Sequence, residues 1–258
     1  MGSMRFRDRV AIITGAGAPG GIGAAVAQEF VAEGGRAVLG ATSERIHDRA
    51  AELGDSAVGV VADLTGDGGA ERLVQAATDR WGRVDVLVNN AGMTSVSSGW
   101  DADGDVVELS RTEWDEALAR NLTTAFVMCR AVVPVMAAAR YGRIVSVGST
   151  TGTTNAMPGQ STYTAAKAGL IGLSRALALE VVQSGITVNV VAPGYITTQS
   201  QLPFEASAAA AGPIGRSGSP AEVAACVLFL AHETASFVTG SVLVVDGGHG
   251  LPETWPRP

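Results

Sequence analysis

Lysine is almost absent from this chain of 258 residues: 17 of its 18 basic side chains are arginine, and Lys167 is its single lysine. No apolar run approaches the ~20 residues of a membrane-spanning helix, and no basic and then apolar leader opens the chain. With a net charge of −7 and a pI near 5.0, the chain is also a poor partner for nucleic acid or an anionic membrane. These features predict a cytoplasmic protein without a nucleic-acid or membrane partner.

Cysteine and histidine are scarce as well. Cys129 and Cys226 fall in helical patterns away from any pair of histidines, so we expect buried free thiols rather than a disulfide or a metal site. The histidines show no metal-ligand spacing and are expected at the surface: His47, His232 and His249. Calcium would be considered only for the acidic loop 101–105. The EF-hand pattern needs Gly at its sixth position and Glu at its twelfth, where this chain has Val106 and Thr112, so a solvated loop and no bound metal are expected.

Apolar runs that end in glycine or polar clusters recur along the chain. The runs expected to form strands are 9–14, 36–41, 58–62, 84–88, 143–147, 186–191 and 241–245. Helical patterns lie between them, at 24–30, 70–81 and 220–231, after the capping box of Ser110 and Glu113, and around Lys167. This alternation predicts an α/β fold: a single-domain Rossmann-type, doubly wound parallel sheet of about seven strands with helices on both faces.

A glycine-rich segment joins the first strand to a helix. Free backbone N–H groups and the helix dipole both favour a phosphate there, so the segment has the outline of a dinucleotide loop. Gly15, Gly17 and Gly20 match the pattern G-x-G-x-x-G. Two more glycines, Gly21 and Gly23, follow on either side of Ile22, closer to the helix. In a chain with 33 glycines that pattern is weak by itself, although the last two lie where the helix would approach the strand closely.

The end of the second strand bears on the choice of dinucleotide. NAD-selective loops usually place a carboxylate there, whereas this chain offers the hydroxyls of Thr42 and Ser43 and the guanidinium of Arg45. That set favours NADP. The glycine loop carries no basic residue, and Glu44 could reach the ribose, so NAD stays open as the alternative.

Two polar features lie on helices. Tyr163 and Lys167 are four residues apart, so the phenol and the ammonium share one face, where the cation can lower the pKa of the phenol. The alternative is a lysine on a solvated helix face. Asn121 falls on the apolar stripe of the helix that starts after Ser110, and a buried amide needs either structural partners or a water chain.

Several short motifs follow one another in order: Thr14-Gly15 with Gly21-Ile22-Gly23, Asn89-Asn90-Ala91-Gly92, Asn121, Ser149, Tyr163 with Lys167, and Pro193-Gly194. Together they resemble the short-chain dehydrogenase/reductase family over residues 7–248, and most of all the β-ketoacyl-acyl-carrier-protein reductases and related carbonyl reductases. The resemblance implies an NAD(P)-dependent oxidoreductase that moves a hydride reversibly between a nicotinamide cofactor and a ketone or secondary alcohol.

The resemblance also implies roles for single residues. Tyr163 would be the general acid in reduction and the general base in oxidation, and Ser149 would hold the substrate oxygen, on which negative charge develops. Lys167 would lower the pKa of the phenol and bind the nicotinamide ribose, and Asn121 would anchor a proton-relay water. The residues expected to contact the cofactor, NADP(H) in preference to NAD(H), are Gly15, Gly17, Gly21, Ile22, Gly23, Thr42, Ser43, Arg45, Asp63, Leu64, Asn90, Ala91, Gly92, Tyr163, Lys167, Pro193, Gly194, Ile196 and Thr198.

The chain departs from the family pattern at two places. Five residues separate Gly15 from Gly21, where three are usual, and the longer loop would reshape the pyrophosphate or ribose pocket. Ser149 precedes Tyr163 by fourteen positions, where thirteen is common, which leaves Thr150 as the alternative oxygen ligand. We favour Ser149 because Gly148-Ser149 fits the end of a strand better.

The substrate is expected to be a small ketone or alcohol, with an acyl thioester among the candidates. Its expected contacts are Ser149, Thr150, Tyr195, Leu202 and Phe204. The last three lie in a mobile, mostly apolar lid at about 195–216, and the absence of Arg and Lys from 199 to 212 argues against an anionic substrate. Two other functions stay open: NAD-dependent oxidation of an alcohol or cyclic diol, and nucleotide binding without turnover, which the complete Ser, Tyr and Lys set disfavours.

The expected boundaries follow. Residues 1–4 are interpreted as an expression remnant and disordered start, 5–250 as the dinucleotide-binding catalytic domain, and 251–258 as a tail on the surface or on a neighbouring subunit. The family resemblance and a stripe of small residues on the Tyr163 helix predict a homotetramer.

Overall fold

The fold is built on one parallel sheet of seven strands. The computed structural model describes residues 4–92 and 104–251. The strand order is β3-β2-β1-β4-β5-β6-β7, and every neighbouring pair is parallel. The strands are β1 Val10–Thr14, β2 Arg36–Ala41, β3 Ala57–Val61, β4 Val86–Asn89, β5 Gly142–Val147, β6 Ile186–Pro193 and β7 Val242–Val245. The predicted fold class is confirmed.

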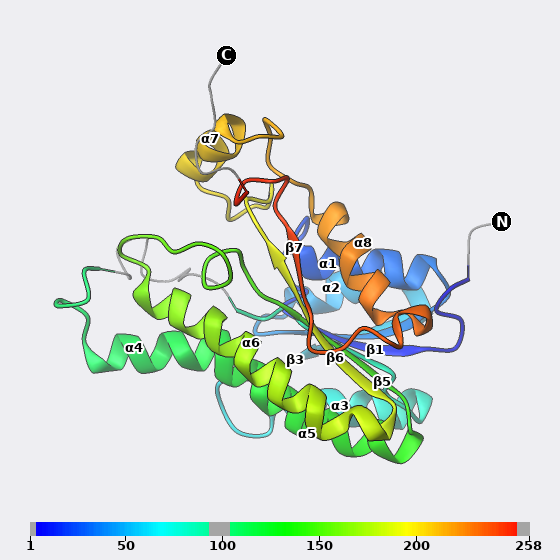
Figure 1. Cartoon of the computed structure of the whole chain (residues 1–258). Coiled ribbons are helices and arrows are strands. Elements are labelled where there is room, and N and C mark those ends of the chain that lie inside the picture. The colour runs from blue at the N-terminus through cyan, green and yellow to red at the C-terminus, as the bar shows by residue number, and fades with distance from the viewer. Residues whose placement is uncertain (1–3, 93–103, 252–258) are drawn as a thin grey trace.

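Helices cover both faces of this sheet. The helices are α1 Ile22–Ala32, α2 Arg45–Ala51, α3 Gly69–Trp81, α4 Arg111–Leu118, α5 Thr124–Ala139, α6 Ser161–Val181, α7 Pro203–Ala211 and α8 Pro220–Ala231. Figure 1 shows α1, α2 and α8 on one face and α3, α5 and α6 on the other. Helix α7 stands beyond the sheet, close to the end of β7. Short 3₁₀ turns follow α2, α6 and α8, at Gly54–Ser56, Val182–Ser184 and Glu233–Ala235.

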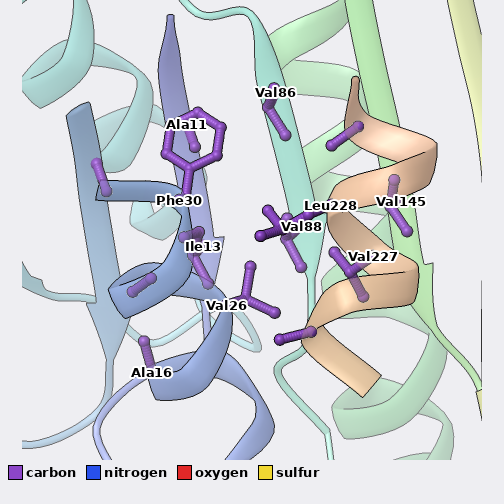
Figure 2. Packing of buried hydrophobic residues seen from close by; sticks show 14 of the residues in the cluster. Ala11, Ile13, Ala16, Val26, Phe30, Val86, Val88, Val145, Val227 and Leu228 are labelled. Atoms are coloured by element: carbon purple, nitrogen blue, oxygen red, sulfur yellow. The ribbon is translucent and has the colours of Figure 1, made fainter. Parts of the chain in front are cut away.

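Each face of the sheet has its own hydrophobic core, because side chains alternate along a strand. Ala11 and Ile13 belong to the core under α1 and α8, whereas Val10 and Ile12 belong to the core under α3, α5 and α6. Figure 2 shows Phe30 of α1 over the first core, with other side chains of α1 and α8 pointing toward β1, β4 and β5. Each large apolar side chain that is fully buried contributes about 1.5–3 kcal/mol.

The helix that starts after Ser110 changes register in its middle. The predicted capping box is confirmed: Ser110 Oγ accepts from the Glu113 N–H, and the Glu113 carboxylate accepts from the Ser110 N–H. Between α4 and α5 lies a π-helical turn, Ala119–Thr123. In the described part of the chain, 111–139 is the one helix long and apolar enough to cross a membrane by length and composition. Because its residues Met128, Val132 and Met136 are fully buried in the second core, we describe it as a core helix.

The structure adds two helices that the sequence did not indicate, α2 and α7. Helix α7 occupies the middle of the predicted lid, which sequence analysis left without regular structure. The fourth strand begins two residues later than predicted, at Val86. Most of the acidic loop lies outside the described residues, so its proposed state as a solvated loop stays a prediction.

Candidate active site

The carboxyl ends of β1 and β4 lie side by side at the centre of the sheet. Strands β2 and β3 follow β1 on one side, and strands β4 to β7 follow it on the other side. The strand order therefore reverses between β1 and β4. In doubly wound sheets the loops at such a point turn to opposite faces and leave a crevice that binds ligands. The glycine-rich loop follows β1 and Asn90-Ala91-Gly92 follows β4, so both predicted cofactor segments meet at this point.

The hydroxyl of Thr14 connects these two strand ends. Its Oγ1 accepts from the backbone N–H groups of Asn90 and Ala91, each at 3.0 Å, and donates to the carbonyl of Val88 at 3.3 Å. The side-chain amide of Asn90 in turn donates to the carbonyls of Thr14 and Gly15, each at 3.0 Å. Five hydrogen bonds therefore fix the glycine loop against β4.

Glycines in this loop leave no room for side chains. A Cβ added to Gly15 would lie 2.9 Å from Ala91 N, and Gly15 has φ +67°, which disfavours other residues. A Cβ on Gly23 would lie 2.6 Å from the Asn90 amide nitrogen, and one on Gly17 2.9 Å from the Cβ of Ala41. The loop thus packs closely on β4 and on the end of β2, leaving the N-terminus of α1 beside it. Backbone N–H groups at this position suit a pyrophosphate, so the residues present fit a dinucleotide.

The ends of β2 and β3 carry the predicted ribose and adenine contacts. Arg45 is exposed and its Nε donates to Ser43 Oγ at 3.4 Å, while Glu44 pairs with His47 at 3.2 Å. Thr42 is exposed beside them.

At the end of β3, Leu64 is buried, and Asp63 Oδ1 accepts from both the N–H and the Oγ1 of Thr65, at 2.8 and 2.7 Å. These two bonds hold the pKa of Asp63 below its usual value.

Ser149 lies just beyond β5 and is hydrogen-bonded to Tyr163 of α6. Its Oγ also accepts from the Thr151 N–H at 3.1 Å, and its carbonyl accepts from Thr153 Oγ1 at 2.7 Å. Gly152, at φ +90°, brings this loop onto α6, since a Cβ there would lie 2.7 Å from the Thr164 carbonyl. The alternative hydroxyl, that of Thr150, is buried, and the Thr150 N–H donates to the Pro193 carbonyl at 2.9 Å.

Lys167 shares the predicted helix face with Tyr163. The ammonium nitrogen lies 5.5 Å from the centre of the Tyr163 ring, and it donates to the Val147 carbonyl at 3.1 Å. The lysine is only 4% exposed, and this burial lowers its pKa to about 8. The solvated alternative considered from sequence is therefore wrong.

The electrostatics of Tyr163 differ from the sequence-based expectation. Burial raises the pKa of the Tyr163 phenol, the hydrogen bond with Ser149 opposes that shift, and the charge of Glu205 adds to it. The ammonium of Lys167 donates to the Val147 carbonyl, and burial of the phenol is the largest cause of the shift in the pKa of Tyr163. The expected lowering of the phenol pKa is not what this geometry produces.

Asn121 is placed by the π-helical turn. It is 4% exposed, and its side-chain amide donates to the Ala117 carbonyl at 3.2 Å. Its Oδ1 faces the end of β4, because a Cβ added to Gly92 would lie 3.0 Å from that atom. Gly92 has φ +135°, which also favours glycine. The β4 end and Asn121 are thus in contact.

The predicted lid is pinned at its base. Ile196 forms a β-bridge with Gly218. The Gly218 N–H donates to the Tyr195 carbonyl at 2.9 Å, and the Thr197 N–H donates to the Gly218 carbonyl at 2.8 Å. Between these points, Thr198 Oγ1 lies 3.1 Å from Ser200 Oγ, and α7 begins after Leu202 with Phe204 partly exposed in its first turn. At the end of β6, the Gly194 N–H next to Pro193 donates to the Val245 carbonyl at 3.0 Å.

The roles of three residues in this region were not predicted from the sequence. Thr14 was seen only as part of a motif, although its hydroxyl joins β1 to β4. Glu205 accepts from the Leu202 N–H at 2.8 Å, and its charge raises the pKa of both Tyr163 and Tyr195. His249 was expected at the surface, but it is half-buried against Tyr195. Leu202 occupies the position where a capping box has Ser or Thr, so no capping pattern marked Glu205 in the sequence.

The remaining candidates are structural. Cys129 is buried and Cys226 half-buried, and both are free thiols, as predicted. Burial raises the pKa of Cys129 to about 11.

His47 is exposed, and His232 is half-buried against Phe6 with ring centres 5.6 Å apart. Among residues 4–92 and 104–251, no three His, Cys, Asp or Glu side chains form a group that could hold a metal ion.

Comparison with known proteins identifies the family. A family model described as enoyl-(acyl carrier protein) reductase matches residues 15–250. The 3-oxoacyl-[acyl-carrier-protein] reductase of Salmonella typhimurium is 39% identical over 250 residues, which cover 95% of this chain and 98% of that protein. This chain belongs to the short-chain dehydrogenase/reductase family. It is an enzyme of that family, a nicotinamide-dependent oxidoreductase.

Further members of the family show the same extent of similarity. The 3-oxoacyl-[acyl-carrier-protein] reductase of Vibrio cholerae is 40% identical over 251 residues, covering 95% of this chain and 98% of that protein. The protein of the same name from Thermotoga maritima is 38% identical over 253 residues, covering 95% and 99%. These short-chain reductases match the present chain along nearly their whole length.

Proposed function

We propose that this short-chain reductase is an NADPH-dependent carbonyl reductase that transfers a hydride to a ketone, with Tyr163 as the proton donor. The observation that carries the proposal is the hydrogen bond between Ser149 and Tyr163 beside buried Lys167, at the edge of the sheet where the glycine loop also lies. Two neighbouring hydroxyls can both contact one carbonyl oxygen, which suits a ketone substrate. We therefore favour ketone reduction over the double-bond reduction that the family description names.

The chemistry follows from the charge that develops on the substrate. When bound, the reduced nicotinamide supplies the hydride to the carbonyl carbon. The carbonyl π electrons move to oxygen, where Ser149 donates a hydrogen bond and Tyr163 transfers its proton to give the alcohol. In oxidation the Tyr163 phenolate accepts the proton from the alcohol. Because burial raises the phenol pKa, the protonated form needed for reduction is the favoured one near neutral pH.

Lys167 and Asn121 complete the proposed set. The Lys167 ammonium would hold the nicotinamide ribose and restore the proton that Tyr163 gives up, assisted by a water that Asn121 anchors. With a pKa of about 8, Lys167 is poised to exchange a proton near physiological pH. The contact between Asn121 and Gly92 supports a role at the cofactor end of the site.

We infer that NADP(H) is preferred to NAD(H). Arg45, Ser43 and Thr42 offer one guanidinium and two hydroxyls to a 2′-phosphate at the end of β2. Asp63 and Leu64 would border the adenine, and the backbone of the glycine loop would hold the pyrophosphate. The end of β6 supplies the nicotinamide contacts in this proposal: Pro193, Gly194, Ile196 and Thr198.

For the substrate we propose a neutral β-ketoacyl compound, an acyl thioester included. The relatives are named as 3-oxoacyl-[acyl-carrier-protein] reductases. Substrate contacts would come from Ser149, Thr150 and Tyr195, and from Leu202 and Phe204 in the lid at about 195–216. The carboxylate of Glu205 and the absence of Lys and Arg from 199 to 212 disfavour an anionic substrate.

We further propose a cytoplasmic homotetramer, with two sets of exposed apolar side chains at its subunit contacts. The first set lies on α5, at the end of α6 and just after it, and comprises Phe126, Leu179 and Val182, which are 45%, 81% and 46% exposed. The other lies on α8 and around β7 and includes Phe229, Phe237 and Val244, which are 48%, 103% and 38% exposed. Single exposed apolar residues are ordinary, so the support comes from several large ones on the same pair of helices or beside the edge strand β7. Light scattering that finds a monomer would contradict this assembly.

The experiment that tests the function is the absorbance change of NADPH and NADH, followed in parallel. The panel contains β-ketoacyl thioesters, β-ketoesters, cyclic and aryl ketones, and an enoyl thioester for the alternative reduction. Turnover of β-ketoacyl compounds with NADPH supports the proposal. Turnover of the enoyl thioester alone, or of no compound with either cofactor, contradicts it.

A further inference from the structure

The residues that follow β7, 246–251, form a compact loop around the carboxylate of Asp246; we refer to them as the C-terminal loop. The N–H groups of Gly248 and Gly250 donate to the two oxygens of that carboxylate, each at 2.9 Å. The Asp246 side chain also packs on Gly194, where an added Cβ would lie 2.8 Å from the Asp246 Cβ. The loop is therefore fixed to the end of β6.

His249 projects from this loop to two parts of the proposed substrate pocket. Its ring meets the ring of Tyr195 edge to face, with centres 5.0 Å apart and planes at 79°. Its Nδ1 faces the end of α7, since a Cβ added to Gly212 would lie 2.7 Å from that atom. Gly212 has φ −80° and ψ 175°, which any residue adopts. Glycine is therefore required there for space and not for backbone conformation.

The glycines of the loop extend the contact to both sides of His249. A Cβ on Gly247 would lie 2.5 Å from Ile214 Cγ2, and one on Gly250 would lie 3.4 Å from Thr154 Oγ1. Between the loop and the lid lies a cavity of about 10 Å³, which has room for about one water. Figure 1 shows the end of β7 running up to α7. The C-terminal loop thus contacts the lid, the end of β6 and the loop that carries Ser149.

We propose that His249 is a positioning residue that determines which ketones the pocket admits. The imidazole sets the orientation of Tyr195, at the start of the lid, and limits how closely the end of α7 approaches the sheet, so it fixes the width of the pocket between Tyr195 and α7. Neither contact touches Ser149, Tyr163 or Lys167, so His249 acts on substrate fit and not on proton transfer. This inference rests on the proposed carbonyl reduction and on Tyr195 lying in the substrate pocket.

A double-mutant cycle between Gly212 and His249 tests the contact directly. In Gly212→Ala the new methyl displaces the imidazole, and we expect KM for a bulky aryl ketone to change about tenfold with kcat unaltered. In the His249→Ala background the same methyl enters the space that the imidazole leaves, and its effect should fall below about twofold. Gly66→Ala is the matched control, because an added methyl there meets no atom within 4 Å. Gly66→Ala should leave both KM and kcat for the ketone unchanged.

Two single variants give a second readout if Gly212→Ala does not fold. His249→Ala should change the ratio of kcat/KM between a bulky and a small ketone about tenfold, whereas His249→Phe, which retains a ring beside Tyr195, should keep the ratio within about twofold. The Kd for NADPH should be the same in all variants. The inference about His249 is overturned if Gly212→Ala changes KM equally in the wild-type and His249→Ala backgrounds. It is also overturned if His249→Ala leaves the ratio of kcat/KM between the two ketones unchanged. Either result leaves the proposed function intact. A wild-type chain that reduces no ketone overturns the proposed function and this inference with it.

Discussion

The ammonium nitrogen of Lys167 lies 5.5 Å from the centre of the Tyr163 ring and donates at 3.1 Å to the carbonyl of Val147, the last residue of β5. One helical turn of α6 therefore presents a phenol and a buried cation at the carboxyl end of the strand that leads to Ser149. The lysine is held by the sheet, and the phenol by the serine. This arrangement leads to separate expectations for the three residues and for their neighbours.

The hydroxyl of Ser149 should carry the contact with the substrate oxygen. Because Ser149 is bonded to Tyr163, Ser149→Ala is expected to lower kcat by about 10²–10³-fold, the usual cost of losing one oxyanion donor. Thr150→Val should change kcat by less than about tenfold, since no transition-state donor is lost. Steady-state kinetics on one ketone decide between them. A larger loss for Thr150→Val would assign the role to Thr150.

Glu205 should shift the pH profile of Tyr163. Its charge raises the phenol pKa, so removing the charge in Glu205→Gln lowers that pKa. Reduction needs the protonated phenol, and its rate falls as pH rises through the phenol pKa. The alkaline limb of the reduction profile should therefore move to lower pH in the variant.

Glu222→Gln is the control for this shift. Glu222 occupies the same position in the first turn of α8 as Glu205 does in α7, and it caps that helix from Ser219. Both variants lose a capping carboxylate, but only Glu205 affects Tyr163. Equal pH profiles for wild type and Glu205→Gln would show that Glu205 does not act on the phenol.

We expect the buried ammonium of Lys167 to lower the free energy of unfolding of the protein. Its folded pKa of about 8 lies below the reference value of 10.5, so the charged form is disfavoured in the fold by on the order of 3 kcal/mol at pH below 8. In Lys167→Met we expect loss of activity together with a Tm raised by a few degrees at pH 7. The gain should shrink as pH rises from about 8 toward 10.5, because the native lysine then sheds its proton.

Calorimetry across that pH range tests the trade-off between stability and function. Lys167→Arg retains a cation that stays charged throughout, so it should show no gain in Tm. A Tm for Lys167→Met that is below the wild-type value, or a difference independent of pH, would mean that burial of the ammonium does not limit stability.

Arg45 should determine the cofactor preference. In Arg45→Gln we expect KM for NADPH to rise about tenfold with KM for NADH nearly unchanged, because only the 2′-phosphate loses a charged partner. Glu44→Gln tests the alternative in which a carboxylate binds the ribose hydroxyls. If Glu44→Gln weakens NADH and Arg45→Gln changes neither cofactor, the end of β2 selects NAD.

Much of this architecture could be predicted because it depends on local patterns. Buried strands such as Val10–Thr14 read as short apolar runs, and the Ser110 capping box marked a helix start correctly. The short helix α2 was missed because it buries only Ile46 and Ala50, and α7 because Ala209 is its single buried residue. Neither helix shows an apolar stripe that sequence analysis could detect.

Other features depend on contacts that no local pattern encodes. The π-helical turn at Asn121 lies between α4 and α5, and no sequence pattern marks it. The raised pKa of Tyr163 depends on burial and on Glu205, more than forty positions away. His249 reaches Tyr195 only because β7 lies beside β6. The residue types of the site could be predicted from the sequence, whereas the tertiary fold determines their electrostatics.

The most direct test of the account is Tyr163→Phe, measured for both catalysis and cofactor binding. The variant loses only the hydroxyl, so we expect kcat for ketone reduction to fall by about 10³-fold or more with the Kd for NADPH unchanged. Tyr141→Phe, which changes a phenol between Arg9 and Arg143 at the opposite end of β5, should retain wild-type rates. A Tyr163→Phe variant that reduces ketones within about tenfold of the wild-type rate would contradict proton transfer by this residue.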